Sequence, residues 1–117
     1  MSALVKPLTW ILGLVLLVVG ILGFFGTPIL GLFEVNTLHN IIHLASGAIA
    51  LVAVSMGYSA ARTYLVVFGI VYLAVAILGF LGVELLTSLV TTNGADNVLH
   101  LAIGGVCILA GLSARRA

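Results

Sequence analysis

Charged side chains are almost absent from four long apolar stretches of the chain, and this constrains the fold more than any other feature. The stretches cover Leu8–Phe25, Thr37–Ala61, Tyr64–Leu81 and about Ala95–Leu112. Only 6% of the residues are charged and 63% are hydrophobic, with a mean hydropathy of +1.42, whereas a soluble domain carries about 25% charged residues. Because about 20 apolar residues cross a bilayer as a helix, the sequence predicts an integral membrane protein with four spans.

The spans are expected to be helices, since their apolarity is continuous and lacks the alternation of barrel strands. Four spans use roughly two thirds of the chain, so residues 1–117 form a single domain without a soluble part. Four scattered Lys and Arg residues cannot form a basic stripe, which excludes nucleic acid as a partner. Cys107 is the only cysteine and therefore cannot form an intramolecular disulfide.

The charges predict the orientation of the spans. All basic residues fall on one side: Lys6, Arg62, Arg115 and Arg116. The acidic residues fall in the other two loops: Glu34, Glu84 and Asp96. By the positive-inside rule, both termini are cytoplasmic. Trp10, Tyr58 and Tyr64 are expected to anchor the same interface.

The two halves of the chain are similar in sequence. Asn36, Asn40, His43, Leu44, Ala45, Gly47 and Ala53 coincide, at a shift of 57, with Asn93, Asn97, His100, Leu101, Ala102, Gly104 and Ala110. We interpret the chain as a tandem repeat of two helix-loop-helix units, residues 7–58 and 63–115 approximately, related by a two-fold axis along the membrane normal.

The second and fourth spans are rich in Gly, Ala and Ser, which let membrane helices approach closely. They are expected to form the tight centre, with the first and third spans more exposed to lipid. Tyr72, in the middle of the third span, is expected to face lipid with its hydroxyl bonded locally; the alternative is that it is a partner for the central polar cluster. The loops Pro28–Asn36 and Glu84–Thr92 are expected to lie over the polar motif as short interfacial helices.

Polar residues cluster where the second and fourth spans begin. Asn36 and Asn93 are predicted N-caps, and Asp96, three residues after Asn93, has the position of a capping-box carboxylate. His43 and His100 follow about 10 Å further along the helix axis, at 1.5 Å per residue. A polar side chain at that depth is costly unless it faces the bundle and finds a partner.

Several roles are compatible with this motif. The first is an interhelix polar cluster in which Asn40 bonds His100 and Asn97 bonds His43 across the axis. The second is a transition-metal site with ligands drawn from His39, His43, Asp96 and His100. The third is a haem held axially by His43 and His100. The fourth is a proton or ion path, although the cytoplasmic halves of these spans lack acidic residues and histidines.

Three segments resemble a known family: the run Gly31–Leu44, the segment Val67–Leu73 and the run Ala95–Leu101, with the doubled Asn-x-x-His-Leu element as the most specific part. They resemble the small bacterial four-helix membrane proteins of domain of unknown function 4383. The resemblance covers nearly the whole chain and implies a four-span protein of the bacterial inner membrane, without an established activity.

The sequence thus predicts an all-α, multi-pass protein of the plasma membrane that is not an enzyme. We expect a structural or partner-binding role, with the core clamped by the duplicated motif and no cofactor; the alternative is a metal- or haem-binding protein that uses His43 and His100. The partner expected is the lipid bilayer, with a homo-oligomer or a larger membrane complex as further candidates.

Overall fold

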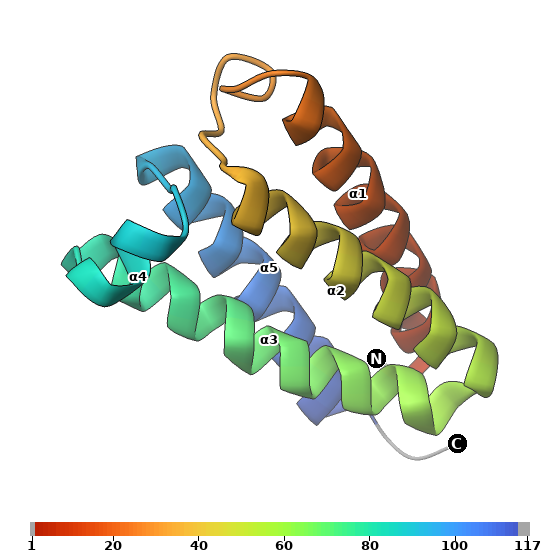
Figure 1. The fold of residues 1–117 in the computed structure, drawn as a ribbon. Coiled ribbons are helices and arrows are strands. Elements are labelled where there is room, and N and C mark those ends of the chain that lie inside the picture. Colours follow the sequence, from red (N-terminus) through yellow and green to blue (C-terminus); the bar gives the residue numbers. More distant parts are fainter. Residues whose placement is uncertain (1, 115–117) are drawn as a thin grey trace.

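The computed structural model describes residues 2–114, and its elements are all helical (Figure 1). A short 3-10 helix, η1 (Ser2–Leu4), precedes α1 (Val5–Phe25), α2 (Thr37–Met56), α3 (Tyr58–Leu81), the short α4 (Glu84–Leu89) and α5 (Gly94–Ser113). Four of these helices, α1, α2, α3 and α5, are long and apolar enough to cross a membrane. The all-helical fold and the four membrane-spanning helices agree with the sequence-based prediction.

The tightest packing lies within two helical hairpins, α1 with α2 and α3 with α5. A Cβ at Gly47 in α2 would lie 2.7 Å from the carbonyl oxygen of Gly13 in α1, and a Cβ at Gly104 in α5 would lie 2.6 Å from the amide nitrogen of Leu73 in α3. The expectation that α2 and α5 form the tight centre is therefore wrong. Their small residues bring each helix against the first helix of its own hairpin instead.

The two hairpins meet mainly through α3, which packs against both α2 and α1. Gly57 alone separates α2 from α3 and has a φ of 124°, a backbone conformation that suits glycine. Tyr64 of α3 is 3% exposed, and its hydroxyl donates a hydrogen bond to the carbonyl oxygen of Ser46 in α2 at 2.8 Å. Tyr64 is therefore not the interfacial anchor expected from the sequence.

The helices alternate in direction, so the basic and acidic groups lie at opposite ends (Figure 1). Lys6 lies in the first turn of α1 and Arg62 near the start of α3, while Glu34 and Glu84 belong to the loops at the far ends of these helices. Arg115 and Arg116, which contributed to the predicted orientation, lie outside the described residues.

The two far loops differ in structure. The second contains α4, so the short helix expected in this loop is present. The first forms a turn closed by hydrogen bonds between Ile29 and Phe33, so the helix expected there is absent. Leu30 and Gly31 have φ angles of 54° and 73°, and these positive values are incompatible with a right-handed helix.

Candidate metal site

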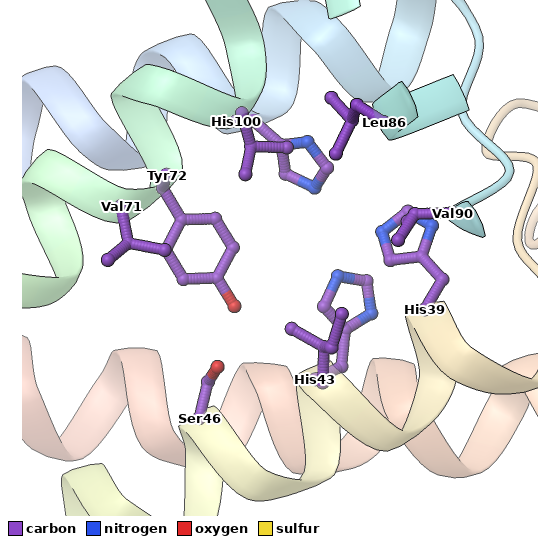
Figure 2. A pocket seen from close by; sticks show the side chains of 10 residues that line it. His39, His43, Ser46, Val71, Tyr72, Leu86, Val90 and His100 are labelled. Carbon is purple, nitrogen blue, oxygen red and sulfur yellow. The ribbon is translucent and has the colours of Figure 1, made fainter. Parts of the chain in front are cut away.

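The three histidines of the chain gather between the hairpins, near the end that carries the acidic loops (Figure 2). His39 and His43 lie one turn apart on α2, and their ring centroids are 4.4 Å apart. His100 comes from α5, and its ring centroid lies 5.4 Å from that of His39 and 6.1 Å from that of His43. One nitrogen from each ring can be chosen so that all three lie within 4.8 Å of one another.

His39 is held in a defined tautomer by the other hairpin. Its Nδ1 lies 2.7 Å from the backbone carbonyl oxygen of Thr91, in the loop that precedes α5. Because a carbonyl oxygen only accepts, Nδ1 carries the proton, and Nε2 of the neutral ring keeps its lone pair. A hydrogen bond of this kind from the distal ring nitrogen to a backbone carbonyl commonly orients a histidine that binds a metal.

Four nitrogens of the three imidazole rings lack hydrogen-bond partners in the described part of the chain. His39 Nε2, His43 Nδ1 and both ring nitrogens of His100 are buried and have no hydrogen-bond partner among the described residues. The three side chains are only 2–3% exposed. A buried polar group without a partner is costly, and this cost repeats at four atoms that lie close together. Such a cluster is typical of a site for a bound ligand.

A cavity of about 70 Å³ adjoins the three rings. Its walls are mostly apolar, with contributions from Ile42, Val71, Val75, Leu86 and Val90, and its other polar side chains are Ser46 and Tyr72. Leu86 and Val90 belong to α4 and the residue that follows it, so the second far loop covers this space (Figure 2). The volume is sufficient for an ion with a small number of water-sized ligands.

Tyr72 lies beside the histidines, which is the less favoured of the two placements that the sequence offered for it. It was expected to face lipid, but it is 4% exposed and its ring centroid lies 5.5 Å from that of His100. Its hydroxyl points toward the Ser46 side chain, between α2 and α3, but no hydrogen bond of ordinary geometry joins the two (Figure 2). The available signal was its helical spacing from Gly69 and Ala76, which lie on the same buried face of α3.

Asp96 does not join the histidine cluster. It forms the predicted capping box: the Asn93 side chain accepts from the Asp96 amide at 2.9 Å, and Asp96 Oδ2 accepts from the Asn93 amide at 2.9 Å. The predicted metal ligand set of three histidines and Asp96 is therefore corrected to three histidines. The carboxylate serves the first turn of its own helix, where it also faces the positive helix end.

The expected hydrogen bonds between the motif amides and the histidines do not form. Asn40 Oδ1 and Asn97 Oδ1 have no hydrogen-bond partner in the described part of the chain, and neither has any ring nitrogen of His100. The amide of Asn40 fills the space that a Cβ at Gly23 would occupy, and the amide of Asn97 does the same at Gly79. Each amide therefore packs within its own hairpin, because the glycine opposite it leaves a gap of the right size.

Both predicted N-caps bind the first turn of their helices and also reach the other hairpin. Asn36 Oδ1 accepts from the His39 amide at 2.9 Å, while Asn36 Nδ2 donates to the carbonyl oxygen of Leu89 at 2.9 Å. Asn93 Nδ2 donates to the carbonyl oxygen of Leu32 at 2.8 Å. Leu32 and Leu89 are separated by the same 57 positions as the two asparagines, so the two bonds are reciprocal. They hold the far loops against each other above the histidines.

A porphyrin is far larger than the cavity of about 70 Å³. His39 also lies beside both His43 and His100, the two rings that would have to face opposite sides of a haem. A single metal ion fits this geometry and a haem does not.

The fold and the site together define a multi-pass, four-helix membrane protein with a buried cluster of histidines. The model of the family described as Domain of unknown function (DUF4383) matches residues 6–113, so the chain belongs to this family. No curated protein and no solved structure matches the chain.

Proposed function

We propose that this protein binds one divalent transition-metal ion through His39, His43 and His100, and that the ion joins the two hairpins of the bundle. The observation that carries the proposal is the convergence of three buried imidazoles whose inward nitrogens lack hydrogen-bond partners. Imidazole nitrogen suits zinc, copper, iron and nickel. The role is structural binding within the membrane, without an enzymatic activity.

The separation of the nitrogens supports a site that closes on the ion. In a tetrahedral zinc site with Zn–N bonds of about 2.0–2.1 Å, the nitrogens lie about 3.3 Å apart. The three nitrogens here lie within 4.8 Å, and small side-chain rotations bring them to the shorter distance. The tautomer of His39, which leaves Nε2 free, supports the same assignment.

The ion would link α2 to α5, two helices that make few direct contacts with each other in the described structure. His39 and His43 belong to α2 and His100 belongs to α5, yet the close helix packing lies within the hairpins. A ligand that binds only the folded state stabilises it by about 4 kcal/mol at a free concentration 1,000 times its Kd. Metal binding should therefore raise the melting temperature of the bundle.

We also propose that the two hairpins are tandem copies of one unit and that both termini face the cytoplasm of a bacterial cell, in its inner membrane. The reciprocal bonds of Asn36 and Asn93 support the repeat. The lysine and arginine at the ends of α1 and α3 that lie away from the acidic loops support the orientation.

Metal analysis of the purified protein tests the proposed site. The chain is purified in detergent through a tag without histidine, stripped with a chelator, and reloaded with Zn²⁺. One ion per chain is expected in the wild type, and the chelator should lower the melting temperature. His43→Ala and His100→Ala should each abolish stoichiometric binding.

Asn40→Ala is the matched control, because Asn40 lies on the same helix and outside the cluster. It should retain the ion. His100→Gln keeps a polar side chain of similar size, so it distinguishes loss of a ligand from a packing defect; it should melt like the metal-free wild type and bind no zinc. A wild-type protein without stoichiometric metal, or histidine variants that keep it, would refute the proposal.

A further inference from the structure

Three histidines leave one position open on a tetrahedral ion. Sites with three protein ligands and an open position bind water or another exogenous ligand there. The side that remains open faces the cavity of about 70 Å³, because the three rings form one part of its wall. The nature of the fourth ligand therefore depends on the charges and hydrogen-bond donors around this cavity.

No carboxylate side chain is available to neutralise a dipositive ion there. Glu34 and Glu84 are exposed in the far loops, and Asp96 is engaged in the capping box. The imidazoles are neutral ligands, and the rest of the wall is mostly apolar. An uncompensated charge in such surroundings is costly, so an anion is favoured over a neutral molecule as the fourth ligand.

A hydrogen-bond donor for this anion is already in place. The hydroxyl of Tyr72 is buried, makes no hydrogen bond of ordinary geometry within residues 2–114, and points toward Ser46 and the space beside His43 (Figure 2). Its side chain is 96% buried, since only 4% is exposed. A phenol aimed into an apolar cavity is satisfied once an acceptor occupies the cavity.

We infer that a small anion, such as hydroxide or a linear triatomic anion, occupies the fourth position and accepts a hydrogen bond from the Tyr72 hydroxyl. This inference rests on the proposed metal site and names its exogenous ligand. The cavity volume restricts the ligand to anions of a few atoms. Tyr72 is a ligand-binding residue in this arrangement, and it is not a metal ligand.

Azide binding to the cobalt-substituted protein tests the inference. Co²⁺ replaces the ion in the chelator-stripped protein, and its visible absorption reports the coordination sphere. Sodium azide should change this spectrum with saturation. In Tyr72→Phe the cobalt content should be unchanged, while the Kd for azide should rise about 10-fold to 100-fold, as expected for loss of one hydrogen bond to a charged group.

Tyr64→Phe is the matched control, since it removes a phenol hydroxyl from the same helix that does not line the cavity and donates to a backbone carbonyl instead. Its azide affinity should equal that of the wild type. Cobalt binding without an azide-dependent spectral change, or equal azide affinity in Tyr72→Phe and the wild type, overturns the inference and leaves the metal site intact. Absence of cobalt binding in the wild type overturns the proposed function and this inference with it.

Discussion

The first turns of α2 and α5 use one architecture for two different purposes. Both begin after an asparagine cap, and both carry the Asn-x-x-His element. They differ at the third helical residue, which is His39 in α2 and Asp96 in α5. Asp96 bonds back to the amide of its own cap, whereas His39 bonds across to Thr91 and turns Nε2 toward the other imidazoles.

This difference shows how one position converts a symmetric scaffold into an asymmetric site. A short carboxylate at the third helical residue accepts a hydrogen bond from the cap amide, so it is not available to a ligand. A longer imidazole has two nitrogens, so it can bond to a backbone carbonyl with one and present the other to a ligand. The N-terminal half therefore supplies two imidazoles and the C-terminal half only one.

His39→Asp makes the two turns alike and should have the largest effect. The new carboxylate is expected to form a capping box with Asn36, as Asp96 does with Asn93, and to leave the cavity with two imidazoles. Removing a group that hydrogen-bonds to a metal ligand lowers the metal affinity about 10-fold to 100-fold. Removing a ligand itself should therefore lower the zinc affinity by more than roughly 100-fold. Competition with a chelating zinc indicator measures the Kd.

Asp96→Asn changes the corresponding residue of α5, in the C-terminal half. It weakens the capping box without removing a histidine, so the zinc affinity should stay within about two-fold of the wild type while stability falls by about 1 kcal/mol. A large loss of zinc affinity in this variant would show that the two turns do not divide their roles as described.

The glycine contacts offer a test of the similarity between the hairpins. In Gly47→Ala and Gly104→Ala, the new Cβ would lie 2.7 Å and 2.6 Å from backbone atoms of the neighbouring helix. Because backbone cannot move aside as a side chain can, each change should destabilise its hairpin by roughly 2 kcal/mol. Thermal unfolding followed by circular dichroism in detergent measures the loss.

Gly105→Ala is the control for this pair, because a Cβ at Gly105 meets nothing within 4 Å. It lies beside Gly104 on the same helix and should be neutral or stabilise the protein by up to about 1 kcal/mol through helix propensity. Equal effects at positions 104 and 105 would contradict the assigned helix contact.

The cap variants should lower stability by about as little as Asp96→Asn does. Asn36→Ala and Asn93→Ala each remove a cap and one bond to the opposite loop, with an expected cost of about 1 kcal/mol apiece. The two variants should nevertheless differ in zinc binding, since Asn36 holds the amide of His39. Zinc titration should show weaker binding in Asn36→Ala and unchanged binding in Asn93→Ala; the reverse order would count against the role assigned to His39.

The membrane-spanning helices and the helix caps follow from local patterns, and these patterns were sufficient to predict them. A continuous apolar stretch and the three-residue spacing from Asn93 to Asp96 each depend on residues of a single helix. The structures that they predict therefore do not depend on contacts with other helices. In contrast, the groups that the side chains of Asn40 and Tyr72 contact depend on how different helices pack. Asn40 was expected to reach His100, but Gly23 on α1 leaves a gap that the amide fills. Tyr72 was expected to face lipid, but the packing of α3 on α5 turns it inward.

The amino-acid sequence alone determined that the chain forms four helices long and apolar enough to cross a membrane, because too few charged groups are present to cover a water-soluble surface. It also determined where two of the helices begin. Only the tertiary structure decided that three histidines meet, that Asp96 stays apart from them, and that a tyrosine hydroxyl completes the cavity wall. The physical reason is that the direction of a side chain depends on the rotation of its helix about its axis. In this protein, glycines at the helix contacts within each hairpin, such as Gly47 against Gly13 and Gly104 against Leu73, bring the helices close enough to fix that rotation.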